Sequence, residues 1–216
     1  MHDIVLMSDP QVTSIPVDES GEVLRDLRVD GDLLIDPRLA DPAGAYAHLR
    51  AGVAERLLQA QSCLPKGVRL LIVEGYRPLW LQTAYFTRHT ADLRLAHPDW
   101  SAQKVYREAS RSLSPPEIGP HVAGAAVDLT LCRPSGEPLP MGGEVNADPE
   151  DDNGACYTAA DLIGEAADNR RLLVETLGGA GLVNYPTEWW HWSYGDRYWA
   201  MVTGAPAACY GHLDEP

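Results

Sequence analysis

The chain has 216 residues, of which 45% are hydrophobic, and its formal net charge is −14. This length predicts a single domain over residues 1–216, and the apolar share is enough for a sizeable core. A surface this acidic repels phosphate groups, which excludes nucleic acid as a partner and argues against docking on anionic membranes. No apolar run reaches the roughly 18 residues that a membrane-spanning helix needs.

The N-terminus and the cysteines indicate the compartment. Residues 1–9 are acidic, and their apolar stretch is shorter than the hydrophobic part of a signal peptide, so we expect a cytoplasmic location. No two cysteines have the CxxC spacing, which argues against a cysteine-based zinc site. We expect free thiols at all four positions, Cys63, Cys132, Cys156 and Cys209.

The elements of the first half follow from apolar spacing. Residues 1–43 are rich in Asp and Pro, and we expect them to wrap the domain as short strands and loops. From Ala45 to Gln61, apolar residues recur at every fourth position, which predicts an amphipathic helix. A buried strand is expected from Val68 to Val73. Two further helices are predicted, over residues 79–96 and from the capping Ser101 to about Ser112.

The second half contains a strand, a long loop, a helix and a last strand. The first strand is predicted from Ala125 to Cys132. Residues 133–158 are rich in Pro, Gly, Asp and Glu, and so long a loop in a compact domain is usually functional, so we expect an active-site loop. A helix from Asn169 to Leu177 and a strand from Glu188 to Tyr194 follow, and the tail has no predicted element. Short strands mixed with helices, without regular alternation, predict an α+β fold.

His121 and Asp128 are the first candidate ligands. Side chains alternate along a strand, so Asp128 faces away from Val127 and Leu129, which we expect in the core. A carboxylate in this apolar setting needs a partner, and a metal ion or an arginine could supply it. His121 lies seven residues earlier, across a loop that contains glycine, and could fold back toward Asp128. A structural salt bridge or a hydrogen-bonded histidine is the alternative for this pair.

The second cluster is Glu188-Trp189-Trp190-His191-Trp192. Glu188 and His191 are three residues apart, so a regular strand would place them on opposite faces. They can share one site only if the backbone turns or bulges between them. The tryptophans would exclude water, and such surroundings raise the pKa of a carboxylate. An aromatic core strand with a capping glutamate is the alternative.

Arg77 is the third candidate, in the segment Gly75-Tyr76-Arg77-Pro78 at the end of a predicted strand. Gly75 allows a tight turn and Pro78 fixes the exit of the chain, so Arg77 can point into a cleft as a fixed positive charge. The alternative is a surface arginine that pairs with one of the many carboxylates.

Together these residues could make a zinc peptidase site. Two histidines and one aspartate form a three-ligand set that leaves a fourth position for water. Glu188 could accept the proton of that water, and Arg77 could stabilise an oxyanion. The ligands favour zinc, one ion per chain, although they also accept other divalent ions.

The combined motifs resemble the VanX-type D-alanyl-D-alanine dipeptidases, within the larger group of zinc D,D-carboxypeptidases and hedgehog-like folds. That group has a His, an Asp seven residues later and a Glu-x-x-His near the C-terminus, which match His121, Asp128 and the segment from Glu188 to His191. The segment around Arg77 matches the arginine motif of the family. The likeness runs from about residue 45 to residue 200.

The resemblance implies a small central antiparallel sheet with helices packed on it, and an irregular start of the last strand. It implies zinc on His121, Asp128 and His191. Glu188 would act as general base and then as acid, and Arg77 would stabilise the tetrahedral intermediate. The expected substrate-binding residues are Tyr76, Gly119, Asn146 and Trp190.

Two positions depart from the family pattern. Gly119 stands where the family usually has a serine, and Asn146 where it usually has an aspartate. In the dipeptidases both groups help to hold the ammonium group of the substrate, so their loss should weaken recognition of a free dipeptide. Acidic residues of the same loop could compensate, namely Glu144, Asp148, Glu150, Asp151 and Asp152.

We therefore expect zinc-dependent hydrolysis of D-Ala-D-Ala, or a closely related small dipeptide, by a metal-activated water. Such an activity recycles cell-wall peptidoglycan units or lowers the supply of an antibiotic's target. The alternative keeps the chemistry and changes the substrate to another dipeptide or amide, because of Gly119 and Asn146. A zinc-binding protein without catalysis is a third hypothesis, disfavoured because a structural site needs neither Glu188 nor Arg77. The sequence leaves the oligomeric state open.

Overall fold

The computed structural model describes residues 4–147 and 154–213. Its strands are β1 (Leu24–Asp26), β2 (Leu34–Ile35), β3 (His48–Arg50), β4 (Arg69–Glu74), β5 (Ala126–Cys132), β6 (Val183–Tyr185) and β7 (Glu188–Ser193). Its α-helices are α1 (Pro10–Thr13), α2 (Leu27–Asp30), α3 (Ala51–Cys63), α4 (Leu79–Ala96), α5 (Ala102–Ala109), α6 (Glu165–Gly179) and α7 (Arg197–Thr203). Two 3-10 helices are η1 (Pro37–Leu39) and η2 (Ala45–Ala47).

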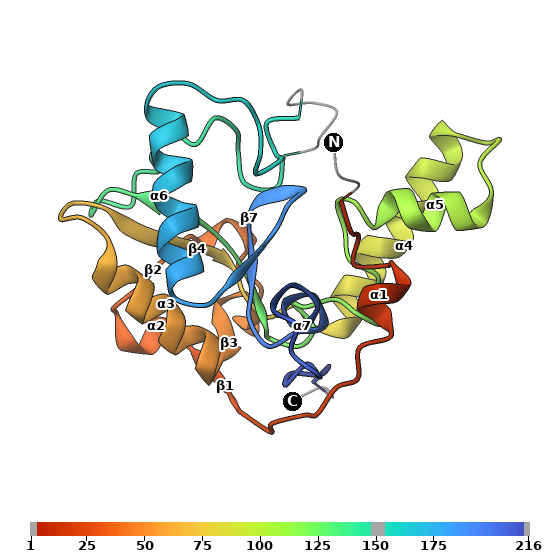
Figure 1. The fold of residues 1–216 in the computed structure, drawn as a ribbon, viewed down its shortest axis with the longest axis horizontal. Helices are drawn as coiled ribbons and strands as arrows, with labels where there is room; N and C mark the ends of the chain where they lie inside the picture. Colours follow the sequence, from red (N-terminus) through yellow and green to blue (C-terminus); the bar gives the residue numbers. More distant parts are fainter. Residues whose placement is uncertain (1–3, 148–153, 214–216) are drawn as a thin grey trace.

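The fold is built on a five-stranded sheet in the order β2-β4-β5-β7-β6, flanked by helices (Figure 1). The neighbours β4, β5, β7 and β6 run antiparallel, whereas the short edge strand β2 runs parallel to β4. Strands β1 and β3 pair separately. The α+β class with a small antiparallel sheet is confirmed, and the short edge strand β2 is its one parallel member in the described residues.

The main core lies between this sheet and the helices α3 and α6. Val127, Leu129 and Leu131 of β5 belong to it, together with Leu57 of α3 and Leu177 of α6. Their alternation is the one that the sequence predicts for a strand with one face in the core. The other face of β5 is therefore left for a site.

The predicted helix from Ala45 to Gln61 is wrong at its start, because α3 begins at Ala51. The preceding residues form η2 and then β3, which pairs antiparallel with β1. Arg50 at the end of β3 is buried, and its Nε donates to the carbonyl oxygen of Ala123 at 2.8 Å. Ala45 and Leu49 are buried as expected, but pairing with a distant segment decides their backbone conformation.

The other predicted helices and strands differ less from the structure at their ends. Helix α5 ends at Ala109, and α6 begins at Glu165, before the predicted Asn169. Strand β6 and helix α7 were not predicted. Residues 133–147 and 154–158 contain no helix or named strand, as expected for the long loop, and residues 148–153 lie outside the described residues.

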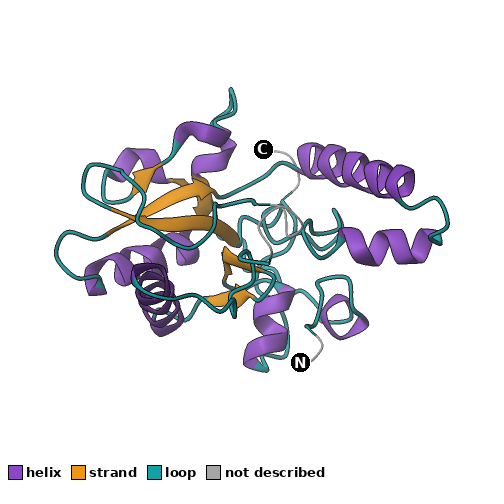
Figure 2. Cartoon of the chain, turned by 90° about the horizontal axis from the view of Figure 1, so that it is seen from above, coloured by secondary structure: helices purple, strands orange, loops and turns teal. Residues whose placement is uncertain are grey.

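Two features frame the far side of the sheet. Helices α4 and α5 form a hairpin that projects away from the strands, toward the right in both views (Figures 1 and 2). The N-terminal residues Leu6, Met7 and Val12 form a second apolar cluster with Tyr185 and Tyr198.

Within the described ranges, no helix is both long and apolar enough to span a membrane. The structure places no disulfide among the four cysteines, all of which lie in its described residues.

Candidate active site

His121 lies in the loop before β5, and the end of β4 fixes its ring. Its Nδ1 is 2.6 Å from the carbonyl oxygen of Gly75. A carbonyl only accepts hydrogen bonds, so Nδ1 carries the proton and Nε2 presents its lone pair. A histidine that binds a metal through one ring nitrogen typically donates a hydrogen bond from the other, often to a backbone carbonyl. Asp128 sits in β5, directly opposite His191 of β7.

A bulge in β7 brings Glu188 and His191 to the same side. Asn184 of β6 pairs with Trp192, yet the next residue, Tyr185, pairs with Glu188, so residues 189–191 have no partner in β6. The Asn184 amide donates from Nδ2 to the carbonyl oxygens of Glu188 and His191, at 3.0 Å each. Glu188 Oε2 lies 3.8 Å from His191 Nδ1 as a result. The expected irregularity of the strand is confirmed.

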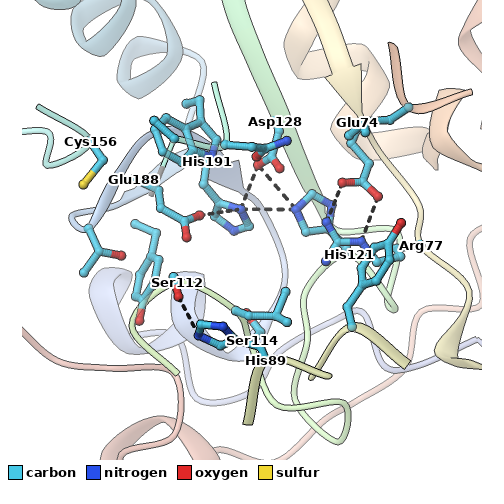
Figure 3. Close-up of a pocket in the computed structure, with 18 residues that line it drawn as sticks. Glu74, Arg77, His89, Ser112, Ser114, His121, Asp128, Cys156, Glu188 and His191 are labelled. Atoms are coloured by element: carbon cyan, nitrogen blue, oxygen red, sulfur yellow. Dashed lines mark hydrogen bonds and ion pairs between the residues drawn. The ribbon is translucent and has the colours of Figure 1, made fainter. Parts of the chain in front are cut away.

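The ligand atoms of His121, Asp128 and His191 meet at one point (Figure 3). Asp128 Oδ1 lies 3.0 Å from His191 Nδ1 and 3.4 Å from His121 Nε2, and the two nitrogens are 3.2 Å apart. A tetrahedral zinc ion with bonds of about 2.0–2.1 Å requires ligand atoms roughly 3.3 Å apart. The three side chains are buried and could hold such an ion.

The two carboxyl groups beside this cluster differ in their proton affinity. Burial, followed by the negative charge of Asp128, raises the pKa of Glu188 well above its usual range, and Arg77 opposes this effect. Burial also acts to raise the pKa of Asp128, but the two histidines outweigh it and hold that pKa well below its usual range. Asp128 therefore stays ionised, whereas Glu188 is suited to take up and release a proton.

Arg77 is buried at the end of β4 and held from two sides. Its Nε donates to Glu74 Oε1 at 2.7 Å, and its Nη2 pairs with Glu74 Oε2. Its Nη1 donates to Gln82 Oε1 at 2.7 Å. Although burial acts to lower the pKa of Arg77, the hydrogen bonds and charge of Glu74 raise it. Arg77 is therefore a fixed cation, and the alternative of a surface arginine is wrong.

These groups line a cavity of about 360 Å³. Asn146 and Trp190, two of the expected substrate-binding residues, line it as well. The indole Nε1 of Trp190 is buried and has no hydrogen-bond partner among the described residues. A bound molecule would be one way to supply the missing acceptor.

The other two expected substrate-binding residues lie elsewhere. Gly119 lines a separate cavity of about 260 Å³. Tyr76 is buried and is not part of the wall of the 360 Å³ cavity. Glu144 lines a third cavity, which makes it a poor substitute for the missing aspartate. The other acidic candidates, Asp148, Glu150, Asp151 and Asp152, lie outside the described residues.

Three supporting residues were missed by the sequence reasoning. Glu74 directly follows the buried strand residues and stands three before Arg77, a spacing that could have drawn attention to it. Gln82 and Asn184 gave no comparable signal, because each acts through a hydrogen bond that exists only in the folded chain.

A buried His/Asp/His cluster beside a carboxylate of raised pKa is the kind of site found in mononuclear zinc hydrolases. Comparison with protein families matches residues 39–204 to Peptidase M15, D-Ala-D-Ala dipeptidase. The chain belongs to this family of metallopeptidases and is an enzyme of that class.

One relative identified by sequence agrees with the family. The D-alanyl-D-alanine dipeptidase of Synechocystis sp. is 29% identical over 220 residues, which cover 87% of each protein. Among solved structures, VanYB in complex with D-alanine-D-alanine has a TM-score of 0.46 at 16% identity, covering 76% of this chain and 81% of that one. The LdcB LD-carboxypeptidase has a TM-score of 0.42 at 16% identity, covering 86% of this chain and 75% of that one.

Proposed function

We propose that the protein is a zinc-dependent dipeptidase that hydrolyses D-Ala-D-Ala or a closely related small dipeptide. The convergence of His121, Asp128 and His191, with ligand atoms 3.0 to 3.4 Å apart, carries this proposal. The family and the relative from Synechocystis, both described by D-Ala-D-Ala dipeptidase activity, support the substrate. A cytoplasmic location and a part in cell-wall metabolism stay predictions.

The proposed roles follow from position and charge. Zinc, when bound by His121, Asp128 and His191, would supply a Lewis acid that polarises water and the scissile carbonyl. Glu188 would accept a proton as the water oxygen bonds to the carbonyl carbon. It would then deliver that proton to the amine as the C–N bond breaks. Arg77, held by Glu74, would stabilise the negative charge on the carbonyl oxygen through its remaining N–H groups.

A different dipeptide or amide is the second candidate substrate, since Gly119 and Asn146 replace the usual ammonium-binding groups. The comparisons do not favour it. Asn146 nevertheless lines the cavity and keeps an amide oxygen that can accept from an ammonium group.

A panel of dipeptides tests the proposal. Zinc-loaded protein is incubated with D-Ala-D-Ala, L-Ala-L-Ala and the two mixed stereoisomers, and the released amino acids are measured. We expect the highest kcat/KM with D-Ala-D-Ala. Zinc-containing protein that releases no alanine from D-Ala-D-Ala would contradict the proposal, and faster cleavage of another dipeptide would establish the second candidate.

A further inference from the structure

The side chain of Gln82 is buried against Arg77 and takes no direct part in the proposed chemistry. Gln82 is 1% exposed and is one of two buried residues in the 18-residue helix α4. Its Oε1 accepts from Arg77 Nη1 at 2.7 Å, and its Nε2 donates to the carbonyl oxygen of Ser114 at 2.5 Å. Because a carbonyl group only accepts hydrogen bonds, the contact with Ser114 determines that Oε1 is the end that faces Arg77. Gln82 thus gives Arg77 an acceptor that carries no charge.

The hydrogen bonds of the Arg77 guanidinium can be counted. It has one N–H on Nε and two on each terminal nitrogen. The Nε group and one group on Nη2 donate to Glu74, beside which Arg77 lies in Figure 3, and one group on Nη1 donates to Gln82. Among the described residues, one N–H group on each terminal nitrogen is left for a ligand of the cavity that Arg77 lines. The main chain of Arg77 is fixed separately, because its N–H donates to the carbonyl oxygen of His121 at 3.2 Å.

Gln82 balances the pull of Glu74 on the guanidinium. A carboxylate attracts the cation toward itself and so competes with an oxyanion for it. Gln82 holds Nη1, the terminal nitrogen that makes no hydrogen bond to Glu74. Tyr85 lies three residues later on the same helix, and its ring centroid is 5.4 Å from Arg77 Cζ. Helix α4 therefore adds two contacts that restrain the guanidinium where Glu74 does not.

We infer that Gln82 is a positioning residue, which holds the Arg77 guanidinium where its two remaining N–H groups meet the oxyanion of the tetrahedral intermediate. This inference rests on the proposed function, because peptide hydrolysis supplies the oxyanion. The oxyanion exists in the intermediate and not in the bound dipeptide. Loss of Gln82 should therefore lower kcat and leave KM nearly constant.

The test replaces Gln82 by leucine, which has a similar size and makes neither hydrogen bond, in zinc-loaded protein. Gln82→Met, with a more adaptable side chain, serves if Gln82→Leu does not fold. Gln61→Leu is the matched control, since Gln61 joins α3 to β4 away from the cavity by accepting from Leu70 N at 2.9 Å. Circular dichroism and zinc content verify folding.

Two readouts separate positioning from general damage. The first is the pair of kcat and KM for D-Ala-D-Ala. The second is the affinity, by calorimetry, for a phosphinate analogue of this dipeptide, whose tetrahedral anionic centre resembles the intermediate. Calorimetry needs no turnover, so the affinity is also measured in Arg77→Ala with and without Gln82→Leu. A residue that acts through Arg77 should have no further effect once Arg77 is absent.

We expect Gln82→Leu to lower kcat about tenfold to hundredfold, the range for one hydrogen bond to a charged group, with KM within about twofold of wild type. Affinity for the analogue should fall by a similar factor, and this loss should vanish in the Arg77→Ala background. Gln61→Leu should match wild type in all three values.

Three results would overturn the inference while leaving the proposed function intact. They are a wild-type kcat in Gln82→Leu, a change confined to KM, and an equal loss of analogue affinity with and without Arg77. A zinc-loaded wild type that neither releases D-Ala nor binds the analogue would contradict the proposed function, and this inference with it.

Discussion

At the scale of single residues, neighbours decide what each group can do. Asp128 and Glu188 are both carboxyl groups in a buried setting, yet the pKa of one is lowered by two histidines and that of the other is raised by burial and by Asp128. The sequence predicts both residues as functional, because Asp128 interrupts an apolar strand and Glu188 adjoins three tryptophans. It could not predict Gln82 or Asn184, whose roles depend on atoms brought close only by folding.

Replacing Glu188 by glutamine tests its proposed role in proton transfer. Glutamine keeps the shape of the side chain but cannot accept and return a proton, so kcat should fall by roughly 10²-fold to 10⁴-fold. Zinc content should stay unchanged, because Glu188 is not one of the three proposed ligands. Glu137→Gln is the control, since Glu137 is exposed and pairs only weakly with Arg133 at 3.7 Å. A Glu188→Gln enzyme with the rate of wild type would remove this residue from the mechanism.

At the scale of elements, distant pairing overrides local pattern. The apolar spacing from Ala45 to Gln61 is genuine, yet its first part becomes η2 and β3 because β3 pairs with β1. Strands β4 and β5 were predicted to within one residue of their bounds, because β4 is mostly a short apolar run and β5 places Val127, Leu129 and Leu131 at alternate positions. The sequence shows only that Glu188 and His191 need a bulge in β7 if they are to share a site. It does not predict that the bulge forms, because the amide of Asn184 that holds it belongs to the unpredicted strand β6.

Asn184→Asp tests whether this amide holds the bulge. Aspartate loses the Nδ2 donor and turns a negative oxygen toward the carbonyl oxygens of Glu188 and His191. We expect a loss of about 1–3 kcal/mol in the free energy of unfolding, together with weaker zinc binding and a lower kcat. Asn169→Asp is the matched control, because Asn169 Nδ2 donates to one carbonyl, that of Pro140, away from the site. Equal effects of the two variants on zinc affinity would contradict the assignment.

Gly75→Ala tests the close approach of β4 to β3. A Cβ at this position would overlap the carbonyl oxygen of His48, so the backbone must move. The carbonyl group of Gly75 fixes the ring of His121, and the shift should therefore weaken zinc binding as well as lower the free energy of unfolding by about 1–3 kcal/mol. Gly178→Ala is the control, since a Cβ there meets no atom within 4 Å and alanine favours a helix. Zinc affinity that is unchanged in Gly75→Ala would contradict this role of the Gly75 carbonyl group.

At the scale of the whole molecule, the two faces of the sheet have different roles. One face packs into the hydrophobic core, and the other carries the candidate active site. Strand β5 buries Val127, Leu129 and Leu131 in the core and presents Asp128 on the opposite face. The site is completed by parts far apart in the sequence: the segment after β4 with Arg77, the loop with His121, β7, and the hairpin of α4 and α5 (Figure 1). The motifs could be recognised one by one in the sequence, but their convergence on one cavity is a property of the fold.

Titration of metal-free protein with zinc, followed by the rate of D-Ala release from D-Ala-D-Ala, tests the central claim most directly. We expect no activity without metal, a linear rise, and saturation at one zinc ion per chain. His191→Ala should remain inactive across the same range. Activity that persists in rigorously metal-free protein, or a wild type that binds one zinc ion and still releases no D-Ala, would contradict the account.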